Sequence, residues 1–146
     1  MTKHVVFVQP KSTGGNFEYV AIPRQGMTFL SAALKQYVEL GNKRGERVVD
    51  WTYETRIWFE DKVGRLDPEK DLEGVDLLCM SGLINEVPRA YELTRLARAA
   101  HPNLKIMGGG PHMGFLYEEA FEHGDFDVIV QHEGEDVIGP IADILL

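Results

Sequence analysis

Hydrophobic residues along the chain gather in short runs, and longer amphipathic stretches separate these runs. Five runs predict β-strands, over residues 5–8, 47–50, 75–80, 105–107 and 126–130. The runs are almost continuously apolar and show little alternation between apolar and polar positions. Strands of this kind are typical of a parallel sheet that helices cover on both faces.

The stretches between the runs predict helices. Residues 27–40 carry apolar side chains at i, i+3 and i+4 spacing, and Gly41 is expected to end this helix. Residues 52–73 are charged and weakly periodic, which indicates a surface excursion with one helical turn near residues 67–71. Further helices are expected over residues 87–100, over residues 115–123, and from Gly134 or Glu135 onward.

Alternation of strands and helices predicts an α/β fold. We expect a flavodoxin-like (Rossmann-like), doubly wound, five-stranded parallel sheet in the order 2-1-3-4-5, with helices on both faces. In this order the ligand crevice is expected beside strands one and three. A chain of 146 residues fits one domain, residues 1–146. Domain boundaries normally fall in polar linkers, but residues 138–146 are mostly apolar. This chain is therefore expected to be the amino-terminal domain of a longer protein.

Composition excludes several classes of function. Fifteen Lys and Arg against 23 Asp and Glu give a net charge of −8, which argues against a nucleic-acid partner. No apolar run is long enough to span a membrane, and no signal peptide is apparent. The lone Cys79 excludes an internal disulfide and a multi-cysteine metal site within this chain. These features predict a cytoplasmic protein.

Glycines and small polar residues follow three of the predicted strands. Gly108, Gly109 and Gly110 follow strand four, and they have no Cβ to keep a ligand away from the main chain. After strand three, Ser81-Gly82 leaves room for a planar group and offers one hydroxyl, although a simple turn with a serine cap is an alternative. Strand five leads into residues 132–136 (His-Glu-Gly-Glu-Asp). The sequence therefore predicts a cofactor-docking edge.

Other nucleotide-binding patterns fit less well. Read from Gly108, the dinucleotide motif Gly-x-Gly-x-x-Gly fails because its sixth position is Met113. A phosphoreceiver needs an aspartate at the end of strand three, where this chain has Met80-Ser81. Residues 11–16 (Lys-Ser-Thr-Gly-Gly-Asn) approximate the FMN phosphate loop of flavodoxins, although Pro23 delays the next helix. FMN binding stays open as an alternative.

Taken in order, these segments resemble the cobalamin-binding domain at the amino terminus of one class of radical S-adenosylmethionine (radical SAM) enzymes. The resemblance covers nearly the whole chain except residues 52–73. It implies a flavodoxin-like fold, with cobalamin lying base-off across the carboxyl ends of the strands and its nucleotide tail running into the domain. The matching segments are Pro10 and residues 22–34, 75–83, 106–112 and 127–135.

The same resemblance bears on the cobalt ligand. Related mutases and methyltransferases use Asp-x-His-x-x-Gly after strand one, and its histidine ligates cobalt. Here the frame reads Gln9-Pro-Lys-Ser-Thr-Gly14, so Lys11 stands in place of the histidine. A lysine ammonium has no lone pair to donate. We therefore expect no protein histidine ligand from the strand-one loop.

The resemblance also implies a set of cofactor-binding residues. Ser81 is expected near the dimethylbenzimidazole base, with the three glycines against the tail. His112 and His132 are candidates for the ligand edge, whereas Glu133 and Glu135 also suit a helix start, where carboxylates complement the dipole. No catalytic or metal-ligating residue is expected. The full cofactor-binding set is Gln9, Lys11, Thr13, Gly14, Arg24, Gln25, Ser81, Gly82, Leu83, Gly108, Gly109, Gly110, His112, Glu133 and Gly134.

The leading hypothesis is a cobalamin-binding module that presents its cofactor to a downstream radical SAM catalytic domain of the methyltransferase or oxidative cyclase type. The iron–sulfur cluster and S-adenosylmethionine would belong to that domain, because Cys-x-x-x-Cys-x-x-Cys is absent here. One alternative is a cofactor-free docking domain of the same enzyme class. The other is an FMN-binding, flavodoxin-like electron carrier.

Overall fold

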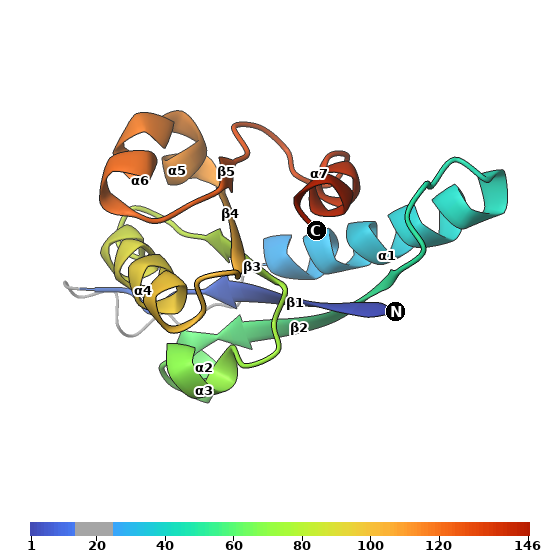
Figure 1. Cartoon of the computed structure of the whole chain (residues 1–146). Helices are drawn as coiled ribbons and strands as arrows, with labels where there is room; N and C mark the ends of the chain where they lie inside the picture. Colours follow the sequence, from blue (N-terminus) through green and yellow to red (C-terminus); the bar gives the residue numbers. More distant parts are fainter. Residues whose placement is uncertain (14–24) are drawn as a thin grey trace.

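A five-stranded sheet runs through the described part of the molecule (Figure 1). The structure is a computed structural model that describes residues 1–13 and 25–146. All four pairs of neighbouring strands are parallel, and the order β2-β1-β3-β4-β5 confirms the predicted fold class. The strands are β1 (Thr2–Gln9), β2 (Thr52–Phe59), β3 (Leu77–Ser81), β4 (Lys105–Gly109) and β5 (Val128–Ile129).

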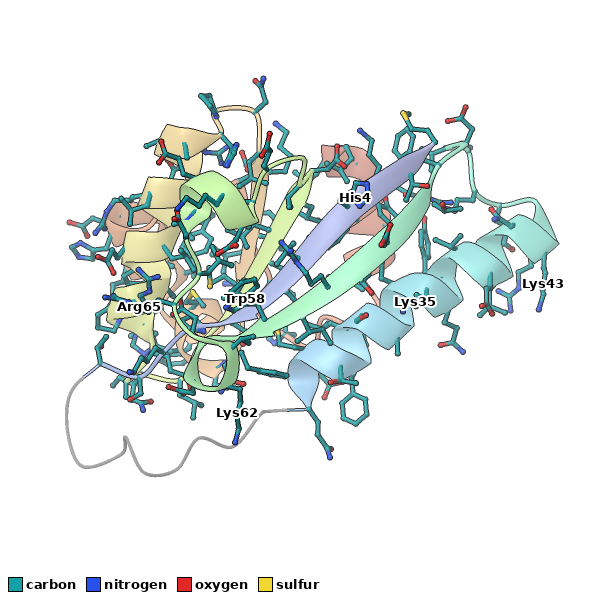
Figure 2. All side chains as sticks on the ribbon, turned by 90° about the horizontal axis from the view of Figure 1, so that it is seen from below. His4, Lys35, Lys43, Trp58, Lys62 and Arg65 are labelled. Atoms are coloured by element: carbon teal, nitrogen blue, oxygen red, sulfur yellow. The ribbon has the colours of Figure 1, made fainter. Side chains whose placement is uncertain are left out.

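Helices cover both faces of this sheet. The long helix α1 and the last helix α7 lie against one face, and α4 with the shorter helices lies against the other (Figure 1). Lys35 and Lys43 lie on the outer side of α1, away from the sheet (Figure 2). The helices are α1 (Gly26–Arg44), α2 (Glu60–Val63), α3 (Pro68–Asp71), α4 (Val87–Ala100), α5 (Pro111–Phe115), α6 (Tyr117–His123) and α7 (Ile138–Leu145).

Alternation of side chains along β1 divides the core into two layers. Val5 and Phe7 pack with α1 and α7, while Val6 and Val8 pack with α4. All four are buried, because β1 is a central strand with helices on both sides. Such a strand reads as a continuous apolar run, which is why the sequence predicts it well. Among the described residues, no helix is long and apolar enough to cross a membrane.

The predicted second strand at residues 47–50 is wrong. Val48 is 98% exposed, and the Arg47 guanidinium is instead bound by Asp143 of α7 and by the carbonyl oxygen of Trp51. Strand β2 begins at Thr52 and occupies the first part of the segment expected to be a surface excursion. Its signal is weak because polar residues occupy the outward positions of an edge strand.

Residues 52–73, expected from the sequence to form a surface excursion, contain strand β2 and the short helices α2 and α3. Tyr53, Ile57 and Phe59 pack into the α1 layer, two or four residues apart as a strand requires. Trp58 points to the opposite layer and donates its indole N–H to the carbonyl of Gly64, 2.8 Å away (Figure 2). The helical turn expected near residues 67–71 is confirmed as α3.

Two predicted helix boundaries are also corrected. Gly41 does not end α1, which continues to Arg44 and stops at Gly45 in the left-handed region, with φ 67°. Gly41 is instead buried against Arg47, where a Cβ would lie 3.2 Å from the Cβ of Arg47, a tight contact. The helix expected over residues 115–123 corresponds to α6, which begins at Tyr117, and the separate short helix α5 precedes it.

The last helix starts later than the sequence indicates. It begins at Ile138, and the residues before it form a turn in which the N–H of Ile138 donates to the carbonyl of Gly134, 2.8 Å away. Glu133 and Glu135 therefore lie in the connection from β5 to α7 rather than in the first turn of a helix. This connection borders the candidate site.

Candidate functional site

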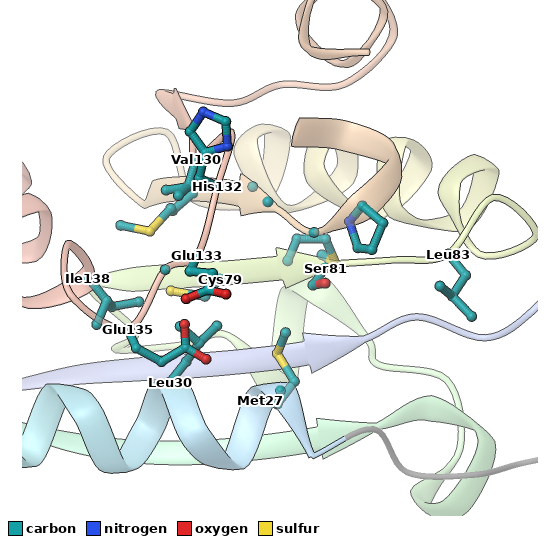
Figure 3. Close-up of a pocket in the computed structure, with 18 residues that line it drawn as sticks. Met27, Leu30, Cys79, Ser81, Leu83, Val130, His132, Glu133, Glu135 and Ile138 are labelled. Atoms are coloured by element: carbon teal, nitrogen blue, oxygen red, sulfur yellow. The ribbon is translucent and has the colours of Figure 1, made fainter. Parts of the chain in front are cut away.

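A cavity of about 350 Å³ opens at the carboxyl ends of β3 and β4 (Figure 3). The first turns of α1 close it on one side, and the connection from β5 to α7 closes it on the other. Its volume lies at the small end of the range for small-molecule pockets. The lining residues are Gly26, Met27, Leu30, Cys79, Met80, Ser81, Leu83, Met107, Gly108, Gly109, Gly110, Pro111, Val130, His132, Glu133, Gly134, Glu135 and Ile138.

The cavity lies beside β3 and β4 rather than beside β1 and β3, where the strand order predicts a crevice. The loop after β1 is tied to the loop after β3 by Asn85. The backbone N–H and the hydroxyl of Thr13 both donate to the carbonyl of Asn85, at 2.8 and 3.1 Å. The Asn85 side-chain amide donates to the hydroxyl of Ser12 at 2.7 Å. The hydroxyls of Ser12 and Thr13 thus bind protein groups in this structure, whereas residues 14–16 of the predicted phosphate loop lie outside the described residues.

The floor of the cavity is apolar. Met27 and Leu30 extend from α1 toward the strands, and Ile138 closes the side next to α7 (Figure 3). Cys79 and Met107 contribute the strand side of the floor and belong to the same buried layer. Burial raises the pKa of the Cys79 thiol well above its usual value, so it stays protonated and uncharged.

Gly109 leaves one wall of the cavity as bare main chain. Residues two apart on a strand share a face, so Gly109 faces the same side as Met107. A Cβ on Gly109 would lie near Val130 only, 3.5 Å from its carbonyl oxygen and 3.6 Å from its Cβ, which are ordinary contact distances. Packing of the protein therefore does not require glycine here. The missing side chain leaves space that a ligand can fill.

The neighbouring glycines have different roles. Gly110 has φ 92°, a region that favours glycine, and a Cβ there would lie 2.5 Å from the hydroxyl oxygen of Ser81. Gly108 faces the opposite layer, where a Cβ would lie 2.6 Å from Ile129 and 2.7 Å from Phe126. Gly110 is therefore required for the turn, and Gly108 for the contact between β4 and its neighbours.

Polar side chains of the cavity gather at its mouth. His132, Glu133 and Glu135 are exposed and lie on the connection after β5. Ser81 ends β3, and no hydrogen-bond partner for its hydroxyl is found among residues 1–13 and 25–146. The mouth can thus bind a polar group of a ligand, and the floor can bind an apolar one.

A buried ion pair fixes the loop after β1. Glu60 follows β2, and its carboxylate accepts hydrogen bonds from the backbone N–H of Lys11 at 2.8 Å and from that of Leu66 at 2.9 Å. The guanidinium of Arg89 on α4 donates to the same carboxylate at 2.8 Å, and both side chains are almost completely buried. Burial would raise the pKa of Glu60, but these hydrogen bonds outweigh it and lower the pKa.

Several predicted residues lie away from the cavity. Gln9 is buried and donates to Glu86 at 3.4 Å, and Gln25 occupies the residue before α1 without a capping hydrogen bond from its side chain to the helix. The ring of His112 contacts Glu119, with 3.0 Å between Nε2 and Oε1. Lys11, Thr13 and Gly82 also lie outside the lining, whereas Gly14 and Arg24 lie outside the described residues. The cavity brings together Ser81, Leu83, Gly108, Gly109, Gly110, Glu133 and Gly134.

Sequence reasoning missed the apolar floor. Met27, Leu30 and Ile138 look like ordinary core positions of amphipathic helices, and Met107 looks like an ordinary strand residue. Nothing in a single sequence separates a core residue that meets another side chain from one that meets a cavity. The one available signal was proximity to the glycine-rich strand end.

The arrangement suits a flat apolar group that enters from the carboxyl edge. Bare main chain at Gly109 forms one wall, and the side chains of Met27 and Leu30 come from the other side. The hydroxyl of Ser81 is available to a polar atom of the ligand. Among the described residues, no group of three or more His, Cys, Asp or Glu side chains is arranged to hold a metal ion.

Comparison with known proteins agrees with this geometry. No curated protein matches the chain. The B12 binding domain family matches residues 65–141, which is more than half of the chain. The matched region includes β3, β4, β5 and most of the cavity lining. This chain belongs to the B12 binding domain family.

Proposed function

We propose that this chain is the cobalamin-binding module of a radical SAM enzyme, and that it presents the cofactor to a downstream iron–sulfur catalytic domain. The observation that carries the proposal is the apolar cavity with bare main chain at Gly109, at the carboxyl ends of β3 and β4. Family membership supports cobalamin as the ligand. The resemblance of the ordered sequence motifs supports the radical SAM context.

The size of the cavity suggests which part of cobalamin it receives. About 350 Å³ suits the base and ribose of the nucleotide tail, and it is too small for the corrin macrocycle. The corrin ring would therefore remain outside, at the carboxyl edge of the sheet. Ser81 and Gly109 border the tail, and Met27 and Leu30 cover its other side.

With the tail bound in the cavity, the base is withdrawn from the cobalt, which is the base-off state. The loop after β1 offers no imidazole in its place. Glu60 holds the backbone of Lys11, and the exposed lysine side chain carries an ammonium without a lone pair. We propose that no histidine of this loop ligates the cobalt.

The reactive chemistry would come from the cofactor, which carries methyl groups or single electrons when bound. The protein would bind the tail, orient the ring and exclude water beneath it. An iron–sulfur cluster and S-adenosylmethionine would be held by the downstream domain, because the single cysteine here is buried. Exposed apolar side chains near the cavity support the docking of such a domain; Ile84 is 73% exposed and Phe115 is 83% exposed.

Hydroxocobalamin binding tests the proposal directly. The purified chain is mixed with excess hydroxocobalamin, passed over a gel-filtration column and examined by visible absorption. Co-elution of the chromophore with the protein, with the absorption spectrum of the base-off form, is the expected result. Complete separation at high micromolar cobalamin would contradict the proposal and favour a cofactor-free docking domain.

The radical SAM context is tested by a separate observation. The coding sequence beyond residue 146 is expected to continue into a domain with the Cys-x-x-x-Cys-x-x-Cys motif. A continuation without three closely spaced cysteines would contradict this part of the proposal. Cobalamin binding by the chain would then still stand.

A further inference from the structure

We propose that the cavity selects among corrinoids by their lower base, and that it prefers dimethylbenzimidazole to adenine. This inference rests on the proposed function, because it assigns the cavity to the nucleotide tail. Corrinoids with either base share the same ring and differ only in the group that would enter the cavity. The protein can therefore distinguish the two bases only through the residues that line the cavity.

The two bases differ in how many hydrogen bonds they need. Dimethylbenzimidazole presents an apolar six-membered ring with two methyl groups. Adenine presents an exocyclic amine and the ring nitrogens N1 and N3 on the corresponding side. Each of these polar atoms loses its water on binding and requires a partner in the protein.

The floor of the cavity offers almost no partners. Leu30 and Ile138 are aliphatic, and the thioethers of Met27 and Met107 are only weak acceptors. The thiol of Cys79 is a weak donor. An adenine that enters this floor would leave its polar atoms unpaired.

The main chain around the floor is also occupied. In the β3–β4 ladder, Met80 lies opposite Gly108 and Ser81 lies opposite Gly109. The carbonyl of Gly108 accepts a hydrogen bond from the N–H of Val130, 2.8 Å away, on the β5 side. Backbone groups engaged in this way are poor partners for a ligand.

Polar groups at the mouth of the cavity do not remove the free-energy cost of leaving polar atoms of adenine unpaired. Glu133 and Glu135 are exposed, and their carboxylates can only accept hydrogen bonds when ionised. A carboxylate could bind the adenine amine, but the ring nitrogens N1 and N3 are themselves acceptors and gain nothing from it. The ring of His132 also borders the mouth, but it points away from Met27 and Leu30 (Figure 3). The single hydroxyl of Ser81 can satisfy one atom, which suits the one free nitrogen of a benzimidazole.

Three ligands separate the outcomes in one titration of the chain, followed by visible absorption. These are cobalamin, the corrinoid with adenine as lower base, and cobinamide, which has no base. Cobalamin is expected to bind roughly tenfold more tightly than the adenine form, the effect of about one unpaired buried polar group. Equal affinities for the two bases would overturn the inference while leaving the proposed function intact.

Cobinamide shows whether the tail contributes to binding. It is expected to bind more weakly than cobalamin, because it leaves the cavity empty. If cobinamide binds as tightly as cobalamin, the tail does not use the cavity and the inference is overturned. Failure of all three ligands to bind would instead refute the proposed function, and this inference with it.

A matched pair of variants on α1 locates the selectivity. Leu30→Gln introduces an amide that can donate and accept in the cavity, and it is expected to reduce the preference for dimethylbenzimidazole several-fold. Leu40→Gln makes the same change on the same helix at a residue outside the cavity lining. It should leave the ratio of the affinities for cobalamin and for the adenine form unchanged. A ratio that is the same in both variants would contradict the assignment of selectivity to the cavity.

Discussion

Gly109 lies opposite Ser81 in the β3–β4 ladder, and both residues border the cavity. Replacing Gly109 by valine would fill the space that the tail requires, because only Val130 lies near the new Cβ. We expect Gly109→Val to weaken cobalamin binding by at least about tenfold while the protein remains folded. Titration by visible absorption and thermal unfolding measure the two effects. Unchanged affinity in this variant would falsify the position of the site.

Gly108 provides the matched comparison for the same strand. Its side chain would face the other layer, 2.6 Å from Ile129 and 2.7 Å from Phe126. Gly108→Ala is expected to lower the free energy of unfolding by about 1–3 kcal/mol through overpacking. Gly109→Ala should change it far less. Urea unfolding of both variants checks this, and equal losses would mean that the two glycines do not face opposite layers as described.

The difference between these glycines marks a limit of sequence reasoning. Gly108, Gly109 and Gly110 stand together in the sequence and look equivalent, yet they serve a packing contact, an open wall and a turn. The central strands could be predicted because burial on both faces leaves a continuous apolar run. The long helices could be predicted because their apolar residues recur at i, i+3 and i+4. Strand β2 could not, because an edge strand carries charged residues such as Glu54 and Arg56 on its exposed positions.

Removing one partner of the buried Glu60–Arg89 pair should be costly. Arg89→Met would leave the Glu60 carboxylate without its cation in a site that is closed to water. We expect the free energy of unfolding to fall by about 3–5 kcal/mol, which is the usual result when a buried charge loses its partner. Chemical unfolding measures the loss. The double variant Glu60→Gln with Arg89→Met should recover part of it, and a double variant no more stable than the single one would contradict this explanation.

Acid should destabilise the protein through its buried carboxylates. Burial would raise the pKa of Glu60 and Asp143, but hydrogen bonds outweigh it and lower both values; these come mainly from Arg89 for Glu60, and from Arg47 and Tyr53 for Asp143. A lowered pKa in the folded state stabilises the protein at pH above the ordinary carboxyl range. This stability is lost as pH falls through the folded-state pKa.

The pH dependence of unfolding measures the effect. The free energy of unfolding should be constant near neutral pH and should decline below about pH 4.5, the ordinary value for glutamate. Asp143→Asn should start from a lower stability and decline less steeply. The same slope in the variant and in the unaltered protein would show that Asp143 does not contribute.

Cys79 should be unreactive in the folded protein. Its thiol is buried in the cavity floor, and burial raises its pKa, so little of the reactive thiolate is present. We expect a thiol reagent to modify it only slowly at pH 8 and rapidly after unfolding in urea. Rapid modification of the native protein would indicate that the cavity opens to the solvent more widely than the structure describes.

The candidate site also shows which contacts a sequence hides. The serine and glycines at the strand ends could be found, because they follow apolar runs directly. The Asn85 bridge to Ser12 and Thr13 could not, because it joins loops more than 70 residues apart. That bridge joins the loops after β1 and β3, and the cavity lies beside β3 and β4.

Helix α7 has a further consequence for the wall of the cavity formed by residues 131–137. At one end of this wall, Val130 is bonded to Gly108 of the sheet. At the other end, Asp143 of α7 accepts hydrogen bonds from Arg47, Tyr37 and Tyr53. A segment anchored at both ends has little conformational entropy left to lose when a ligand arrives. Binding should therefore need little rearrangement of this wall. Little of the favourable free energy of its contacts with the ligand should be offset by the entropy cost of ordering it.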